Sequence, residues 1–285
     1  ILFVVRFVSF YFLLRCRVAD GQPDKGKQRL AEVQKTFDSL KQLLPGSPDD
    51  SLKVHRLTLL SGLQQFTGNI KMEYAEQALS IAEELNYKKG IVMAYKEIAN
   101  SYQLKNDYQN AIIILKKGIA LSETMDIITD NTVFYSALLN LYFYLGDYPN
   151  AMETIIREKL VAEKINDKKR IAHCENILGY IFLKQENFEA AETGYNRYIN
   201  LASALKDSMM MAHALGELSD VYTGEKKYRQ AVDVLLRTIN LCDRLLANPG
   251  TQDKGYVYGL VPQYKSKAFY RLGKNYKLLG EYRLA

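Results

Sequence analysis

The sequence has little cysteine, which limits the ways in which the fold is stabilised. Three cysteines occur in 285 residues: Cys16, Cys174 and Cys242. Cys174 and Cys242 fall at helix positions near the expected packed face, so we interpret both as small buried hydrophobic residues. We therefore expect stability to come from packing and not from a disulfide framework, even in an exported protein.

The sequence also lacks any block of lysine and arginine. Its formal net charge is +6, with 25% charged and 48% hydrophobic residues. A surface that follows nucleic acid phosphates needs clustered cations, so we expect no nucleic acid binding by this segment. The composition is otherwise that of an ordinary globular chain.

No motif typical of catalysis is present. The sequence contains no metal-ligand spacing, nucleophile elbow or phosphate-binding loop. One suggestive pair is His173 and His213, which lie 40 residues apart, but two imidazoles do not make a zinc site, which needs about four ligands. We therefore predict no enzyme activity, catalytic residue, metal or cofactor. We interpret the two histidines as ordinary polar residues, with a pH-sensitive contact as the alternative.

What the sequence does contain is a pattern that returns every 40 residues. An aromatic residue marks each copy: Tyr108, Tyr148, Phe188 and Tyr228. Three residues after each marker comes an alanine: Ala111, Ala151, Ala191 and Ala231. An aromatic residue six positions before each marker and an aliphatic residue ten positions before it recur as well: Tyr102, Tyr142, Phe182 and Tyr222, and Ile98, Leu138, Leu178 and Leu218. Four positions kept in register over four copies indicate an array of one repeated unit.

Each copy has the periodicity of two helices joined by a short polar turn. Tyr95, Ile98 and Tyr102 fall at i, i+3 and i+7, on one face of a helix. The second run has its apolar face at Ala151, Ile155, Ile156 and Leu160 in the second copy, and at Ala231, Val234, Leu235 and Ile239 in the fourth. The recurring alanine lets the two helices pack at the usual separation of ~8–10 Å, which a longer side chain would prevent.

This pattern resembles the tetratricopeptide repeat (TPR), whose helix-turn-helix carries W-x2-L-G-x2-Y and then A-x3-F. The first helices read Tyr95-x2-Ile98-Ala99-x2-Tyr102, Tyr135-x2-Leu138-Leu139-x2-Tyr142, Glu175-x2-Leu178-Gly179-x2-Phe182 and Leu215-x2-Leu218-Ser219-x2-Tyr222. The period of 40 and the first positions Glu175 and Leu215 depart from that pattern. The resemblance implies an all-α fold, an α-solenoid of antiparallel helical hairpins in a right-handed superhelix with about five to six repeats.

The register divides residues 22–285 into successive segments. They are an N-terminal capping helix at 28–44, repeats at 52–86, 90–125, 130–165, 168–205 and 208–246, an inserted loop at 247–261 and a truncated last repeat at 262–285. The capping helix is predicted from a stripe of Leu30, Val33, Phe37, Leu40 and Leu44.

The inserted loop is predicted from turn chemistry at Asn248-Pro249-Gly250 and Lys254-Gly255. We interpret it as a tolerated insertion, with a ligand-contacting loop carrying Tyr256 and Tyr258 as the alternative. We also expect further sequence beyond both ends of the chain.

Residues 1–21 have the features of a cleaved secretory signal peptide. An apolar core from Phe7 to Leu14 is flanked by arginines, and Ala19-Asp20-Gly21 has the small-x-small form of a cleavage site. The alternative is a membrane anchor, for which the apolar run is shorter than the ~20 residues of a span. We therefore expect an exported protein, located in the periplasm or cell envelope.

TPR arrays line a concave groove with their first helices, and the resemblance implies where a ligand would bind. Projected onto this sequence, the contact positions are Lys96, Asn100, Gln103, Ser136, Asn140, Phe143, His173, Asn176, Tyr180, His213, Asp220, Lys267, Tyr270 and Lys274. Amide groups and aromatic rings on such a surface suit a peptide or protein segment.

The function that this resemblance favours is a non-catalytic interaction scaffold. More narrowly, the chain is similar to the exported sensor region of bacterial TPR-containing histidine kinases or related signalling proteins, in which an output domain follows. That reading implies a membrane contact only through a downstream anchor or an uncleaved N-terminal segment. The alternative is a stand-alone assembly factor or adaptor of the cell envelope.

Overall fold

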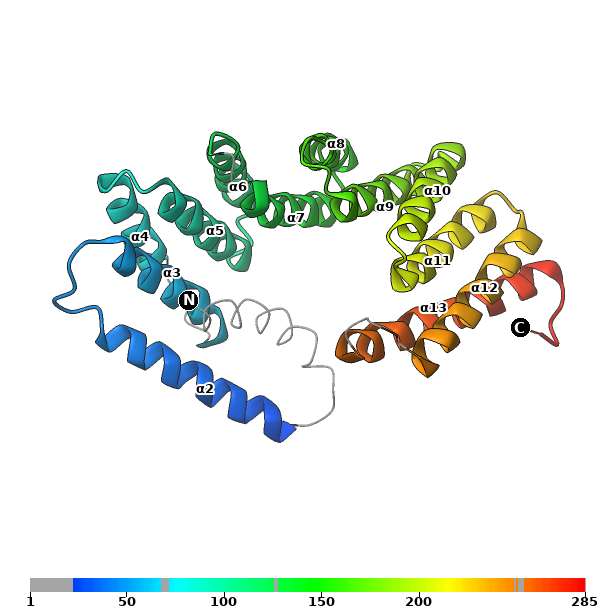
Figure 1. Cartoon of the computed structure of the whole chain (residues 1–285), viewed down its shortest axis with the longest axis horizontal. Coiled ribbons are helices and arrows are strands. Elements are labelled where there is room, and N and C mark those ends of the chain that lie inside the picture. The colour runs from blue at the N-terminus through cyan, green and yellow to red at the C-terminus, as the bar shows by residue number, and fades with distance from the viewer. Residues whose placement is uncertain (1–22, 68–71, 126–127, 249, 251–253, 285) are drawn as a thin grey trace. The chain divides into compact units, whose positions relative to one another are not determined.

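The computed structural model describes residues 23–67, 72–125, 128–248, 250 and 254–284. Twelve helices, α2 to α13, follow one another in these ranges, which contain no strand (Figure 1). The predicted all-α fold class is confirmed, and the helices pack as consecutive hairpins. The predicted signal peptide, residues 1–21, lies outside the described residues.

The chain forms two compact units, residues 1–138 (unit 1) and 139–285 (unit 2). Unit 1 holds α2 (Pro23–Gln42), α3 (Ser51–Thr67), α4 (Glu73–Glu84), α5 (Lys88–Leu104), α6 (Tyr108–Glu123) and the first part of α7 (Ile128–Leu145). Unit 2 holds the rest of α7, then α8 (Tyr148–Lys164), α9 (Lys168–Lys184), α10 (Phe188–Ala204), α11 (Ser208–Gly224), α12 (Tyr228–Ala247) and α13 (Lys254–Leu279).

The aromatic markers begin the second helix of each hairpin, since α6, α8, α10 and α12 start at the four marker residues. Two residues earlier the backbone is left-handed in every copy: Asn106, Gly146, Glu186 and Lys226 have φ between 58° and 70°. Asp107, Asp147 and Asn187 then cap their helices by accepting a hydrogen bond from the backbone N–H three residues later. One turn geometry, repeated four times, keeps the hairpins alike.

The recurring alanines Ala111, Ala151, Ala191 and Ala231 are fully buried, as their packing role requires. The helices come closest in the hairpin of α9 and α10, where glycines face each other. A Cβ atom added at Gly194 would lie 3.2 Å from the Cα and N atoms of Gly179. The second helix of this hairpin therefore packs directly on the backbone of the first.

The apolar face predicted for α8 is partly wrong. Ile156 and Leu160 are 45% and 55% exposed, whereas Ala151 and Ile155 are fully buried as expected. Thr154, Glu158 and Ala162 complete the buried stripe of α8 instead. The prediction failed because it assumed apolar residues throughout the stripe, and a glutamate occupies one of its central positions.

Helix α2, Pro23–Gln42, covers most of the range 28–44 predicted for the capping helix, and it packs on α3. Its stripe is buried at Val33, while Phe37, Leu40 and Leu44 are partly covered. Leu30 is exposed, so the stripe is covered from Val33 onwards and not along its whole predicted length.

The predicted loop 247–261 is wrong from Lys254 onwards, because α13 begins there and continues to Leu279 through Pro262. Val257 and Val261 are fully buried against a cluster that includes Met209 and Cys242. A proline inside a helix costs about 3 kcal/mol, and burying two valines recovers roughly that amount. Packing against the preceding hairpin thus outweighs the turn chemistry of the sequence.

The last predicted repeat, 262–285, is represented by this first helix and a turn. Gly280 is left-handed, with φ of 79°, and ends the helix. Tyr282 falls at the marker position but lies exposed in the following turn, and Ala285 is outside the described residues.

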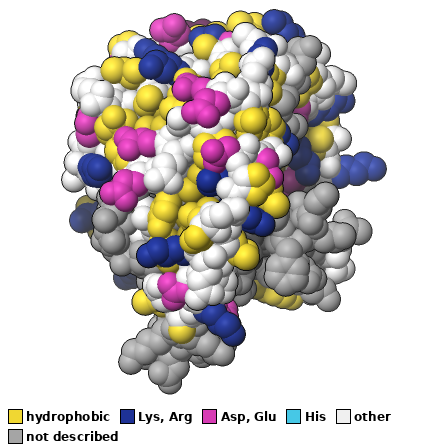
Figure 2. Space-filling view, turned by 90° about the vertical axis from the view of Figure 1, so that its left-hand side faces the viewer, with side chains coloured by type: hydrophobic (Ala, Val, Ile, Leu, Met, Phe, Trp, Pro, Cys, Tyr) yellow, Lys and Arg dark blue, Asp and Glu magenta, His cyan; other side chains and the backbone are white. Residues whose placement is uncertain are grey.

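The surface shown in Figure 2 mixes lysines and arginines with acidic and hydrophobic side chains. No block of one charge sign stands out among the described residues of that face, in keeping with the even charge pattern of the sequence. None of the helices in the described ranges has both the length and the apolar character needed to cross a bilayer.

Candidate functional site

The first helices of unit 2 lie next to one another, because α11 contacts both α9 and α13. We call the side chains that α7, α9, α11 and α13 present beside their packed stripes the first-helix face of unit 2. Eight of the predicted contact residues belong to it: Phe143, His173, Asn176, Tyr180, His213, Asp220, Lys267 and Lys274.

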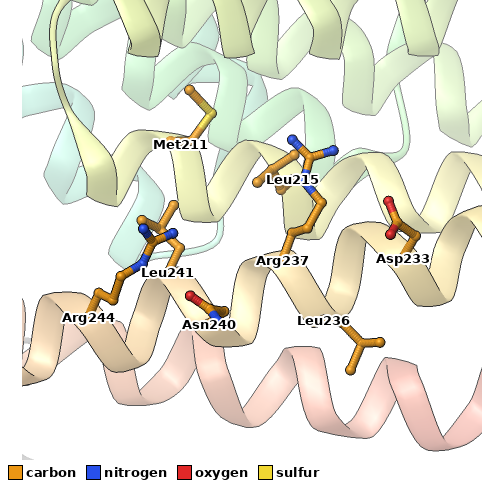
Figure 3. A pocket seen from close by; sticks show the side chains of 8 residues that line it. All are labelled: Met211, Leu215, Asp233, Leu236, Arg237, Asn240, Leu241 and Arg244. Atoms are coloured by element: carbon orange, nitrogen blue, oxygen red, sulfur yellow. The ribbon is translucent and has the colours of Figure 1, made fainter.

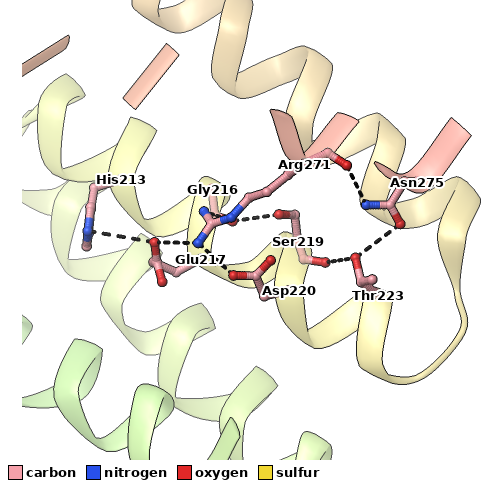
Figure 4. A network of polar contacts seen from close by, with 8 residues as sticks. All are labelled: His213, Gly216, Glu217, Ser219, Asp220, Thr223, Arg271 and Asn275. Carbon is pink, nitrogen blue, oxygen red and sulfur yellow. Dashed lines mark hydrogen bonds and ion pairs between the residues drawn. The ribbon is translucent and has the colours of Figure 1, made fainter. Parts of the chain in front are cut away.

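Arg271 on α13 joins its helix to α11 (Figure 4). Its guanidinium donates to the backbone oxygen of Gly216 at 2.9 Å and lies 3.1 Å from Oε1 of Glu217 and 2.6 Å from Oδ2 of Asp220. All three side chains are largely covered by protein. Arg271 thus pairs with two carboxylates and fixes the spacing of two successive first helices.

A second polar link joins the same two helices one turn further along α13 (Figure 4). Thr223 on α11 donates its hydroxyl proton to Oδ1 of Asn275 at 3.1 Å, and the amide of Asn275 donates to the backbone oxygen of Arg271 at 2.9 Å. Asn275 is buried. Because buried amides need partners, this link rigidly sets the position of α13 against α11.

His213 lies between an aromatic and an acidic neighbour. Its Nδ1 is 3.4 Å from the Tyr198 hydroxyl, its Nε2 is 4.0 Å from Oε1 of Glu217, and its ring centroid is 5.2 Å from that of Tyr264. Burial lowers the pKa of His213, Glu217 opposes this shift, and positive charge on Lys267, Arg271 and His173 adds to it. His213 is therefore an uncharged hydrogen-bonding group near neutral pH.

Aromatic surface continues the first-helix face towards α7. The rings of Phe143 and Tyr180 meet edge to face with centroids 5.5 Å apart, and Nζ of Lys184 lies 5.3 Å from the centroid of Tyr180. Both rings are half-buried, so part of each remains open to solvent. This pair offers apolar contact area that loses little rotamer freedom on binding.

Two of the predicted residues of unit 1 contact a carboxylate that the prediction omitted. Lys96 lies 3.6 Å from Oε1 of Glu97, and Asn100 also hydrogen-bonds this carboxylate. Burial raises the pKa of Glu97, and the contacts with Lys96 and Asn100 oppose the shift. Gln103 has a buried side-chain amide, and Ser136 is half-buried. Lys96 and Asn100 therefore hold Glu97.

Other predicted residues stay apart from the network on α11 and α13. Asn140 and Tyr270 are exposed and Asn176 is half-buried. Within the described ranges none of these three forms a hydrogen bond or ion pair with Arg271, Glu217 or His213. Lys267 and Lys274 are also exposed, but their charges act on His213 and Asp220.

The prediction missed Glu217, Arg271, Tyr198, Tyr264 and Lys184. A signal for the first two exists in the repeat register. Tyr222 and Tyr276 occupy equivalent positions, so Glu217 and Arg271 do as well. Opposite charges at one repeat position on adjacent first helices predict an ion pair between them, as the structure has.

Metal-binding groups and reactive cysteines are the two further kinds of site that the residue types in the described part of the chain could form. No group of three or more histidine, cysteine or acidic side chains that could hold a metal occurs there. Cys174 and Cys242 are free and buried, as predicted, and burial raises the pKa of both thiols. A buried protonated thiol is a poor nucleophile, so both cysteines serve packing.

A depression of about 610 Å³ lies elsewhere, between α11 and α12 (Figure 3). Apolar and charged side chains from the two helices line it: Met211, Leu215, Asp233, Leu236, Arg237, Asn240, Leu241 and Arg244. None of these residues belongs to the predicted contact set, so the depression is a separate surface.

Comparison with solved structures shows the fold. RapI in its apo form matches 90% of this chain and 72% of its own, with a TM-score of 0.67 and 11% identity. The apo quorum sensor NprR from B. thuringiensis matches 96% of this chain and 83% of its own, with a TM-score of 0.54 and 15% identity. No protein family model matches the chain, and no curated protein resembles it in sequence.

A third structure carries the repeat in its description. The signal transduction ATPase PH0952 from Pyrococcus horikoshii, a protein with a tetratricopeptide repeat sensor, matches 93% of this chain with a TM-score of 0.52 and 16% identity. The chain corresponds to 46% of that longer protein. This protein therefore has the fold of TPR-like α-solenoids.

Proposed function

We propose that the chain is a non-catalytic scaffold that binds a peptide or protein segment along its first helices. The observation that carries this proposal is the convergence of side chains from α7, α9, α11 and α13 on one face, braced by Arg271. An extended peptide needs hydrogen-bonding partners for its backbone and apolar surface for its side chains. Asn176 and His213 offer the first, and the rings of Phe143 and Tyr180 the second.

The charges on this face favour a segment that carries acidic residues. Glu217 and Asp220 share one cation, Arg271, and the three lysines Lys184, Lys267 and Lys274 are exposed, so four positive charges face two negative ones. The face therefore has an excess of positive charge. Electrostatic complementarity of this kind contributes mainly to the rate and specificity of binding.

The narrower proposal is a ligand-sensing region of an exported signal-transduction protein, with an output domain elsewhere in the full chain. Two similar folds support it, because NprR is described as a quorum sensor and PH0952 as a signal transduction ATPase with a TPR sensor. The signal-like residues 1–21 support export. A stand-alone envelope adaptor is the alternative.

Peptide selection tests the binding proposal. Peptides selected from a random displayed library on the wild-type chain should bind in calorimetry and lose at least tenfold in affinity to the double variant Asn176→Ala/Tyr180→Ala. The matched control is Asn196→Ala/Tyr282→Ala, which removes an exposed asparagine of α10 and an exposed tyrosine of the C-terminal turn. Equal affinity for the wild type and the first variant would place binding elsewhere.

The reading frame of the gene tests the sensor proposal. A membrane helix and a kinase or DNA-binding domain encoded after residue 285 would support it. A stop codon soon after that position, with no membrane helix, would favour the adaptor. Export is tested separately by fusing residues 1–21 to alkaline phosphatase, which is active only outside the cytoplasm.

A further inference from the structure

Two successive hairpins of unit 2 carry different residues at equivalent repeat positions. In the hairpin of α9 and α10, the buried carboxylate of Glu175 lies 2.7 Å from Nζ of Lys159 and 3.9 Å from Nη1 of Arg197. Adding 40 to each number gives Ile199, Leu215 and Arg237 in the next copy. The arginine is kept, while its carboxylate and the lysine are replaced by apolar residues.

Arg237 therefore lacks the carboxylate that its counterpart Arg197 has. Within the described ranges no acidic side chain lies within 4 Å of the guanidinium of Arg237, and the same holds for Arg244, seven residues further along α12. Seven residues are about two helical turns, so both arginines lie on one side of α12. Asp233, four residues before Arg237, does not reach ion-pair distance either.

The two arginines stand beside the depression between α11 and α12. Figure 3 shows Arg237 extending from α12 towards Leu215 on α11, the residue that replaces the missing glutamate. Leu241 and Met211 supply further apolar surface, and Leu236 is exposed at the edge. The depression of about 610 Å³ thus combines an apolar floor with two guanidinium groups that have no acidic partner among the described residues.

We infer that this depression binds a carboxylate supplied from outside the chain, namely an acidic side chain flanked by apolar residues in a partner protein segment. The carboxylate lies in the depression beside Leu215 and pairs with Arg237, while Arg244 adds positive charge. A guanidinium binds a carboxylate in a bidentate, charge-assisted manner. The neighbouring apolar side chains of the segment pack on Leu215, Leu241 and Met211. The site is distinct from the first-helix face and does not depend on the function proposed for it.

The test uses two capped peptides, acetyl-Leu-Leu-Glu-Leu-Leu-amide and its counterpart with glutamine in place of glutamate. Each is titrated into the whole chain and followed by chemical-shift changes of the backbone amides. The glutamate peptide is expected to bind at least tenfold more tightly than the glutamine peptide, with the largest changes on α11 and α12. The difference should shrink as salt is raised, because the contact is charge-assisted.

Variants locate the contact. Arg237→Gln is expected to abolish the preference for the glutamate peptide, and Arg244→Gln to weaken it. Arg229→Gln, which removes an exposed arginine on the same helix outside the depression, should leave it unchanged. Folding of each variant is confirmed by its circular dichroism and melting temperature.

Three outcomes would overturn the inference. They are equal binding of the two peptides, a preference that survives Arg237→Gln, and shift changes confined to residues away from α11 and α12. Free hexanoate and its uncharged amide, hexanamide, are titrated into the chain in the same way as the peptides. Tighter binding of free hexanoate than of the glutamate peptide would contradict a protein segment as the ligand and identify a small carboxylic acid instead.

Discussion

The hairpin of α9 and α10 and the hairpin of α11 and α12 share one frame and differ in their polar chemistry. In both, the second helix begins at the aromatic marker, and the alanine three residues later is fully buried. Only the first of the two binds a buried carboxylate, Glu175, with Lys159 and Arg197. The comparison shows that the repeat determines the positions of the side chains, whereas the residue types at those positions differ between copies.

Another pair of repeat positions shows how the copies stay packed while their residues change. The second helix contributes Gly118, Glu158 or Tyr198, and the following first helix contributes Phe134, Cys174 or Ala214. A Cβ at Gly118 would lie 2.3 Å from the ring of Phe134, and Tyr198 shares a core cluster with Ala214. A large residue on one helix is thus matched by a small one on the next.

The largest expected effect concerns Glu158, which holds the place of Tyr198 in the earlier hairpin. It is fully buried, and neither carboxyl oxygen has a hydrogen-bond partner. Burial raises the pKa of Glu158 from 4.5 to about 7, although the positive charge of Arg170 opposes this. The folded chain therefore retains a proton that the unfolded chain releases.

Stability should consequently fall as pH rises from 4.5 towards 7 and then level off, by about 3 kcal/mol from this group. Glu158→Gln should be as stable as the wild type at pH 4 and about 3 kcal/mol more stable at pH 8. Urea unfolding of both proteins at the two pH values measures this difference. Identical pH profiles would show that the carboxyl is not buried as described.

The next effect exploits the glycine contact of the α9 and α10 hairpin. Gly194→Val inserts the residue that the next copy carries as Val234. Because Gly194 faces the backbone of Gly179, this change should overpack the hairpin and lower the free energy of unfolding by ~2 kcal/mol. Thr193→Val, at an exposed position of the same helix, is the control and should change stability by less than about 0.5 kcal/mol. An unaltered urea midpoint for Gly194→Val would refute the close contact.

Arg271→Gln tests the brace between α11 and α13. Losing its contacts with Glu217 and Asp220 leaves two partly covered carboxylates without their cation, at a cost of ~2 kcal/mol. Hydrogen exchange should accelerate in α13 more than in α9, which lies one hairpin away. Arg283→Gln, in the exposed C-terminal turn, is the control. Unchanged protection of α13 in the first variant would show that Arg271 does not hold the helix.

The smallest expected effect comes from Glu175→Leu, which gives the earlier hairpin the residue of the later one. Lys159 keeps Glu163 at 3.7 Å, and Arg197 is largely exposed. Lys159 therefore keeps an acidic partner and Arg197 stays solvated, so the loss should be only about 1 kcal/mol. Thermal unfolding measures it, and a loss above about 3 kcal/mol would indicate that the pair behaves as a buried one.

The arrangement of the helical hairpins could be predicted from the sequence because it depends on residues that recur in each copy. The markers Tyr108, Tyr148, Phe188 and Tyr228 correctly locate four helix starts, since each copy repeats the same local turn and packing. The N-terminal part of α13 could not be predicted, because Val257 and Val261 are held by tertiary packing that outweighs the glycines and Pro262.

Less of the candidate site was predictable. The rings of Phe143 and Tyr180 do meet, and His213 lies with them on the first-helix face. Glu217 and Arg271 lie outside the TPR consensus positions, and their contact depends on opposite charges in adjacent copies. The depression beside Arg237 likewise depends on the residue that replaces Glu175 one repeat later.

The central claim is that the hairpins share one backbone arrangement and differ in the side chains that it carries. The most direct test is to introduce the counterparts of Lys159 and Glu175 into the next repeat. The measurement is a crystal structure of the double variant Ile199→Lys/Leu215→Glu. The new carboxylate should lie within ion-pair distance of both the new lysine and Arg237, as Glu175 does with Lys159 and Arg197. A carboxylate turned into solvent, with Arg237 unpaired, would contradict the equivalence of the two hairpins.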